Sequence, residues 1–379
     1  MTALDLTRER VRRDVDALAR AGLDLDTFFE EMVHSVQRAV PWVAACLGTQ
    51  DPATLLLTSA HKYGHLRGDN SHDLEFGILE YGTVETTAFT ELARAPVPAA
   101  GVHLVTNGDV ERSHRMRDFM TPHYGFADEI RVIYREGTRA WGTMSLFRGS
   151  DDDPFDADDV EFLASLSPIL ALGVRSGILS RLAAPAAAPD AGPAVLIVGS
   201  DDRIQQLTPG AEARLSELDW GRAAVEPMST VYSLVGMARR FGDGESVSPP
   251  RGRIRTARGQ WLMLHAAPLS SSSERRGDVV VTIEEARPPE IVDLVVAAFD
   301  LTARERDVTR LVLQGVDTKE IAAGMHVSTY TVQDHLKSIF DKAGVRSRRE
   351  LVGRVYFDQY VPRMGTQLDP SGWFSSPTS

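Results

Sequence analysis

Polar side chains with the chemistry to read DNA recur at helical spacing between residues 329 and 341 of this 379-residue chain. Gln333, Asp334 and Lys337 share one face of a helix, because residues three and four apart lie on the same side. In the major groove an amide pairs with adenine, an ammonium reaches guanine, and a carboxylate accepts from the cytosine amine. The face could therefore contact base edges, provided that neighbouring helices hold it against the groove.

Four helices are predicted around this face, and each has its own start and stop signals. Thr302 and Glu305 form a capping box at the start of the first helix. Ser328 is expected to cap the third helix and Gly344 to end it. The helices are expected over 303–313, 318–324, 329–342 and 348–356, with a turn at 324–327. A short helix, a tight turn and a longer helix with a polar outer face make a helix-turn-helix.

The distribution of charge permits nucleic-acid binding, although the total charge argues against it. The chain has a net charge of −12, whereas DNA phosphates require cations. Residues 325–355 hold six Lys and Arg against three Asp and Glu, so this segment has a local charge of +3. Basic charge is thus segregated into the predicted helical module of an acidic chain.

Four segments of this module, in order and at matching spacing, resemble the LuxR/GerE-type four-helix DNA-binding domain. The segments are Leu301-Thr-Ala-Arg-Glu305, Lys319-Glu-Ile-Ala-Ala323, Val327-Ser-Thr-Tyr-Thr-Val-Gln-Asp-His-Leu336 and Lys342-Ala-Gly-Val-Arg-Ser-Arg348. The resemblance covers about 60 residues and implies a transcriptional regulator that recognises double-stranded DNA with its third helix.

The resemblance also assigns roles to residues of this module. Base contacts fall on Gln333, Asp334 and Lys337, and phosphate contacts fall on Lys319, Thr329, Thr331 and His335; Tyr330 and Arg346 are further candidates for contact with DNA. The fourth helix, 348–357, falls where the family often dimerises. The acidic Asp334 departs from the family pattern and leaves the operator sequence open.

Other interpretations of the same residues remain. The helices could form a bundle that docks proteins, with Lys337 and Arg346 as solvated surface charges. His335 is equally well explained as a half-buried structural residue.

Residues 1–181 resemble a GAF domain. A strand at Trp141-Gly-Thr-Met-Ser-Leu-Phe147 precedes Phe155-Asp-Ala-Asp-Asp-Val-Glu-Phe-Leu163, and GAF domains commonly end in such a strand and helix start. Helices are predicted at 7–40 and 160–182. Strands are predicted at 43–47, 54–60, 102–106, 128–134 and 139–148, from short apolar or alternating runs.

Residues 194–287 resemble a PAS domain, because 196–212 reads as a hairpin that leads into a short helix, which Thr208 is expected to cap. An Ala/Pro-rich linker is expected at 182–193, a connecting helix at 288–299, the DNA-binding domain at 300–360 and a flexible tail at 361–379. The predicted fold class is therefore an α+β multidomain chain. Two antiparallel-sheet sensor domains precede an all-α helix-turn-helix domain.

Aromatic side chains of the GAF-like segment are candidates for a ligand pocket, or they simply fill its core. They are Trp42, Tyr63, Phe76, Tyr81, Phe126, Tyr134 and Trp141. The histidines and carboxylates of 61–73 read as a polar surface loop, and no spacing typical of a metal site is present. Cys46 is the only cysteine. It is interpreted as a small buried apolar residue, with a redox sensor as the alternative.

Together these features predict a cytoplasmic one-component regulator that acts as a homodimer, with RNA polymerase as a further partner. No motif of a catalytic site is found, so an enzyme is not expected. No cofactor is predicted, but a small-molecule ligand could bind either sensor domain; alternatively these domains serve only to dimerise. No apolar run approaches the roughly 18 residues that cross a membrane, and no membrane partner is expected. The alternative function is a sensor scaffold that acts through protein contacts and binds DNA weakly.

Overall fold

The computed structural model describes residues 3–180, 193–218, 228–245, 249–256, 261–269 and 277–357. The chain forms two compact units. The first comprises 1–177, 191–257 and 262–285, and the second comprises 178–190, 258–261 and 286–379. The predicted linker, apart from Pro193, and the predicted tail lie outside the described residues.

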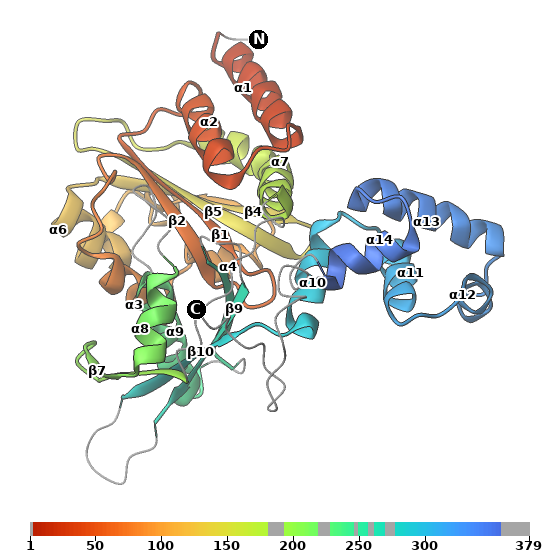
Figure 1. Ribbon diagram of the computed structural model, residues 1–379. Coiled ribbons are helices and arrows are strands. Elements are labelled where there is room, and N and C mark those ends of the chain that lie inside the picture. The colour runs from red at the N-terminus through yellow and green to blue at the C-terminus, as the bar shows by residue number, and fades with distance from the viewer. Residues whose placement is uncertain are drawn as a thin grey trace, which may run out of the picture. The chain divides into compact units, whose positions relative to one another are not determined.

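The first unit begins with a five-stranded sheet in the order β2-β1-β5-β4-β3 (Figure 1). Its paired strands are all antiparallel. The strands are β1 (Ala44–Gln50), β2 (Leu57–Gly64), β3 (Ala99–Gly101), β4 (Asp128–Glu136) and β5 (Arg139–Arg148). Strands β4 and β5 are almost wholly buried, because helices cover both faces of the sheet.

Three helices cover one face of this sheet: α1 (Ala3–Arg20), α2 (Leu25–Gln37) and α7 (Ala157–Ser180). The helix predicted over 7–40 is divided in two, because Gly22 adopts a left-handed conformation with φ of 68°. Helices α2 and α7 pack closely at Gly173, where an added Cβ would lie 2.1 Å from Phe28. A larger residue at 173 would push the two helices apart.

Helix α7 corrects the expectation that no apolar run is long enough to cross a membrane. By length and composition alone, residues 157–179 could cross one. More than half of the window is nevertheless buried within the protein, and Ser167 donates a 2.6 Å hydrogen bond to the carbonyl of Ile133 in β4. These contacts are those of a core helix, whose apolar sequence matches its burial against the sheet.

Short helices cover the opposite face. They are α3 (Asp73–Gly82), α4 (Phe89–Leu92), α5 (Val102–Val105), η1 (Val110–Arg112), η2 (Met116–Met120) and α6 (Thr121–Tyr124). The prediction of a strand at 102–106 was wrong, because this segment forms the helical turn α5. The carboxylate of Asp128 accepts from the His103 amide at the start of this turn, and Thr106 bonds back to the Val102 carbonyl. The distant Asp128 carboxylate and the local Thr106 hydroxyl thus satisfy backbone groups of a turn, which favours a turn over a strand.

The second sheet repeats the topology of the first, in the order β7-β6-β10-β9-β8. Its strands are β6 (Ala194–Val198), β7 (Ile204–Leu207), β8 (Arg251–Arg255), β9 (Trp261–Pro268) and β10 (Val279–Glu285). Helix α8 (Pro209–Ser216) begins at the predicted Thr208 cap, and α9 (Met228–Gly242) follows. The predicted α+β class, with two antiparallel sheets before a helical region, is confirmed.

The two sheets share one compact unit because α3 lies directly against α9. An added Cβ at Gly77 would approach the Ser229 carbonyl to 2.8 Å, so the backbones of the two helices nearly touch. Leu56 and Tyr81 of the first half also join the apolar core of the second half. A bidentate ion pair completes the contact, with Arg253 donating to both oxygens of Asp51 at 2.7 and 2.6 Å.

The second unit is helical. It contains α10 (Pro288–Ala298), α11 (Ala303–Leu313), α12 (Thr318–Met325), α13 (Thr329–Ala343), α14 (Arg348–Val352) and the π-helical turn η3 (Gly353–Phe357). The predicted capping box of Thr302 and Glu305 is present, and Ser328 caps α13 as expected. Gly344 ends α13 in a left-handed conformation with φ of 64°.

We expect Asp51→Asn to lower the free energy of unfolding of the first unit by roughly 3–5 kcal/mol, because it leaves Arg253 buried without its carboxylate. Urea denaturation of the full chain measures the change. Asp16→Asn is the matched control, since it removes the exposed pair with Arg20, and exposed ion pairs contribute little to stability. Equal losses in the two variants would contradict a stabilising role for the buried pair.

Candidate nucleic-acid interface and buried cavity

Helix α13 exposes one continuous polar face. Tyr330, Gln333, Asp334 and Lys337 are all exposed, and Tyr330 retains 72% of its surface. The opposite face buries Val332, Leu336, Ile339 and Ala343 against the helices packed beside it. The three residues assigned to base contacts therefore lie together, and they point away from the core of the unit.

Helix α12 and the turn after it set the position of α13. Asp317 caps α12 by accepting from the amides of Lys319 and Glu320 at 2.7 and 2.9 Å. His326 ends α12 in a left-handed conformation with φ of 55°, a position where Gly or Asn is more usual. This residue reverses the chain within a short turn before the Ser328 cap.

The remaining predicted DNA contacts fall into two groups. Lys319, Thr329 and Arg346 are exposed, so solvent or a phosphate can reach them. Thr331 and His335 are half-buried, and the Thr331 hydroxyl lies 2.9 Å from the Ser328 hydroxyl. Thr331 therefore serves the helix cap whatever else it contacts.

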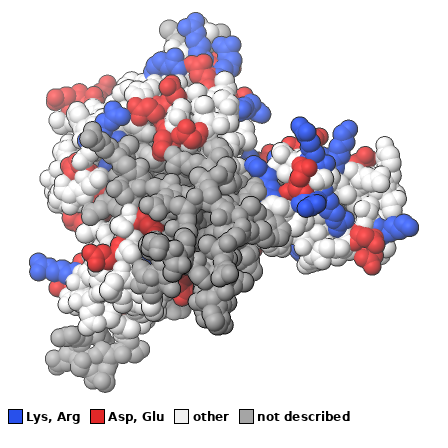
Figure 2. Space-filling model, viewed as in Figure 1, with Lys and Arg blue, Asp and Glu red and all other residues white. Residues whose placement is uncertain are grey.

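The cations of this surface differ in whether they form salt bridges with the described residues. Neither Lys319 nor Lys337 forms a salt bridge there, whereas Lys342 is held by Glu305. Figure 2 shows Lys and Arg side chains gathered over the C-terminal helices, beside a smaller acidic area. Unpaired ammonium groups on one face are suited to contact phosphates, since no intramolecular bond must break first.

Glu305 connects α11 to α13 through hydrogen bonds. Its carboxylate accepts from Ser338 at 2.6 Å and from Lys342 at 2.7 Å, and it also closes the capping box with the Thr302 amide. Burial alone would raise the pKa of Glu305, but these hydrogen bonds outweigh it and lower the pKa to about 2. The polar face of α13 is thus held in place by a buried carboxylate on a neighbouring helix.

The first unit contains a cavity of about 60 Å³, enough space for a few water molecules. Its wall combines α3, η2 and the face of the first sheet with residues of α9. Of the seven aromatic candidates, Phe76 lines the cavity, but the others are not among the described lining residues. Those others are Trp42, Tyr63, Tyr81, Phe126, Tyr134 and Trp141, all of them buried.

The cavity wall is apolar except for a few buried polar groups. Lys62 and Asp73 form an ion pair within it, and the hydroxyls of Thr143 and Ser145 also line it. Cys46 lies on the same wall. Burial raises the pKa of its thiol to about 11, which disfavours the thiolate needed for redox sensing.

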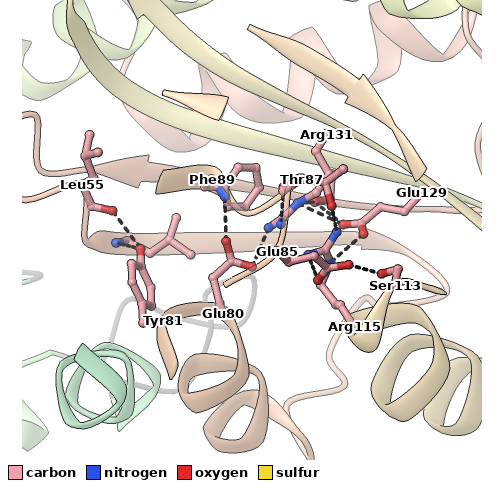
Figure 3. Close-up of polar contacts among 12 residues, drawn as sticks. Leu55, Glu80, Tyr81, Glu85, Thr87, Phe89, Ser113, Arg115, Glu129 and Arg131 are labelled. Atoms are coloured by element: carbon pink, nitrogen blue, oxygen red, sulfur yellow. Dashed lines mark hydrogen bonds and ion pairs between the residues drawn. The ribbon is translucent and has the colours of Figure 1, made fainter. Parts of the chain in front are cut away.

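Buried ions tie the helices of this face to the sheet (Figure 3). Arg131 donates to Glu80 of α3 at 2.8 Å and lies 3.2 Å from Glu129. Arg115 donates to Glu129 and Glu85, each at 2.8 Å. Burial would raise the pKa of Glu129, but the two arginines reverse the shift and lower it. Sequence reasoning missed this network, because its members are far apart in the chain.

A second grouping was also missed. His72 was predicted to lie in the polar surface loop of 61–73, and no role was predicted for Glu75 or His123, but the ligand atoms of these three residues lie within 4.8 Å of one another. Only the fold reveals it, since 48 residues separate Glu75 from His123.

Residues 300–355 match the family of bacterial regulatory proteins named luxR. The spore germination protein GerE of Bacillus subtilis is 42% identical over 52 residues, which are 14% of this chain and 70% of that protein. The monoamine regulon transcriptional regulator of Klebsiella aerogenes is 34% identical over 98 residues, 25% of this chain. The chain spans only 42% of the length of that regulator.

Among solved structures, a GAF domain of A. aeolicus nlh2 in an inactive state aligns with a TM-score of 0.29 and 12% identity, over 45% of this chain and 96% of that one. A complex of Vibrio cholerae VqmA with ligand and DNA aligns with a TM-score of 0.24 and 17% identity, over 44% and 83% of the two chains.

We expect Glu305→Gln to lower the free energy of unfolding of the helical unit by roughly 1–3 kcal/mol near neutral pH, because it weakens the bonds to Lys342 and Ser338. In the parent chain the folded pKa of about 2 lies below the ordinary 4.5. The ionised Glu305 carboxylate therefore contributes fully to the free energy of unfolding above about pH 4.5. This contribution is lost as the pH falls toward 2.

Hydrogen exchange of the amides in α11 and α13, measured across this pH range, tests the expectation. Glu320→Gln is the control, since this glutamate is exposed on α12. If hydrogen exchange depends on pH in the same way in Glu305→Gln as in the parent, Glu305 is not the group that causes the loss of stability in acid.

Proposed function

Because the chain belongs to the luxR family of bacterial regulatory proteins, we propose that it regulates transcription by binding double-stranded DNA through helices α12 and α13. The observation that carries the proposal is the exposed face of α13, where Gln333, Asp334 and Lys337 lie together within the matched segment. A helix with such a face fits the major groove and can present amide, carboxylate and ammonium groups to base edges.

In this proposal the exposed residues around the face set its register on the DNA backbone. Lys319 at the start of α12 and Thr329 at the start of α13 are exposed and contact phosphates, together with Arg346 beyond the end of α13. The N-terminus of α13 adds backbone amides that favour an anion. Phosphate contacts of this kind position a protein on DNA, and base contacts give it specificity.

We further propose a homodimer that recruits or blocks RNA polymerase in the cytoplasm and carries out no catalysis itself. Helix α14 and η3 supply the dimer surface that the family resemblance assigns to this region. Two helix-turn-helix units one turn of DNA apart would then read two half-sites.

The first unit is proposed to sense a small molecule. Its cavity offers apolar contacts from Phe76, Phe119 and Phe147 together with the polar Lys62–Asp73 pair. The cavity volume of about 60 Å³ admits a compound of only a few non-hydrogen atoms, with an apolar body and one polar group that meets this ion pair. A ligand that prefers one state of this unit would alter the affinity for DNA through the balance of the two states.

We expect Lys337→Ala to weaken binding to a specific operator by about 1–3 kcal/mol, because a base or phosphate contact is lost. Fluorescence anisotropy with DNA fragments selected from the source genome measures this affinity. Arg310→Ala is the matched control, because Arg310 is an exposed cation of the same unit that is paired with Asp307.

The control should leave the affinity nearly unchanged. Two results would count against the proposed interface. One is an equal loss in both variants; the other is the failure of every fragment to bind above the nonspecific level at about 100 mM salt.

A further inference from the structure

Two imidazoles and a carboxylate converge on the surface of the first unit, where α3 begins and α6 ends. His123 Nε2 lies 3.1 Å from Glu75 Oε2, and His72 Nδ1 lies 3.7 Å from the same oxygen. All three ligand atoms lie within 4.8 Å of one another. His72 directly precedes α3, Glu75 is in its first turn, and His123 is in α6.

These separations match the edges of a metal coordination polyhedron. Bonds from zinc to imidazole nitrogen or carboxylate oxygen are about 2.0–2.2 Å, so two ligand atoms in a tetrahedral site lie about 3.4 Å apart. The two separations from Glu75 Oε2 fall on either side of this value. A cation could therefore bind after small rotations of the side chains, with no change in the backbone.

Aromatic neighbours already hold the two imidazoles. The rings of His72 and His123 stack with centroids 3.7 Å apart and an interplanar angle of 22°. Phe119 meets His123 edge-on at 5.1 Å, and Tyr124 meets His72 edge-on at 5.8 Å. Less rotamer freedom is lost on binding when the ligands are held in this way, which favours binding.

We propose that His72, Glu75 and His123 bind a divalent transition-metal cation, with zinc as the best match. Two nitrogens and one oxygen suit zinc and its neighbours, whereas magnesium and calcium prefer oxygen ligands throughout. Solvent reaches the site, since the side chains of His72, Glu75 and His123 retain 32%, 53% and 27% of their exposure. Three protein ligands leave a coordination position for water, as in sites that exchange their ligands.

A cation here would also join two parts of the cavity wall. Asp73 and Phe76 line the cavity and flank Glu75 on α3, and Phe119 and Tyr124 line it beside His123. Metal binding would therefore link α3 to the segment of η2 and α6 that faces it. The site lies in the first unit alone, so zinc binding there can be tested separately from DNA binding.

Calorimetric titration of the full-length, tag-free and chelator-treated protein with zinc chloride tests the proposal. We expect one zinc per chain, and at least about ten-fold weaker binding in Glu75→Gln and in His123→Ala. Cobalt(II) should give the visible absorption of a site with nitrogen ligands, and magnesium should produce no heat. His114→Ala is the matched control, because His114 is an exposed histidine beside Asp118 that is not part of the cluster.

Thermal unfolding provides a readout that does not depend on the calorimeter. Zinc should raise the midpoint of the parent and of His114→Ala, but not that of Glu75→Gln or His123→Ala. Circular dichroism of the zinc-free variants establishes that each is folded. Unchanged zinc affinity in folded Glu75→Gln and His123→Ala, or an equal loss in His114→Ala, would overturn the proposal.

Discussion

The position of helix α3 depends on one buried ion pair, between Glu80 and Arg131. Both side chains are fully buried, and Arg131 belongs to β4, which pairs with the central strand β5. A buried charge is stable only with its partner in place, so this pair fixes α3 against the sheet. Three other features of the first unit depend on the position of α3. It forms part of the cavity wall, it carries Glu75 of the surface cluster, and it meets α9 of the second half through Gly77.

The sequence predicted local structure well wherever short-range chemistry decides it. The Thr302 capping box, the Thr208 cap and the glycine that ends α13 all act within a few residues, and each was identified from spacing alone. The apolar periodicity of α13 likewise gave its buried and exposed faces. Of the five strands predicted within residues 1–181 from alternation or short apolar runs, four lie within about four residues of their observed bounds.

Features that depend on long-range contacts could not be predicted in this way. The turn at 102–105 is helical because Asp128, 25 residues later, accepts its first free amide. The cavity wall includes α9, although every aromatic candidate for a ligand pocket lies within the first 181 residues. The His72, Glu75 and His123 cluster uses two elements that meet only in the folded chain. Aromatic residue type alone did not distinguish Phe76, which lines the cavity, from Trp141, which is buried in the core.

The contact between α3 and α9 also bears on the modularity of this chain. Ser229, Thr230 and Ser233 of α9 line the same cavity as Phe76 of α3, and Leu56 completes the apolar core of the second half. A gene fusion that transplanted the first 180 residues alone would carry an incomplete cavity and an uncovered apolar face. The smallest portion that can be inherited or exchanged with this cavity intact therefore extends through both sheets, to about the end of β10 at Glu285.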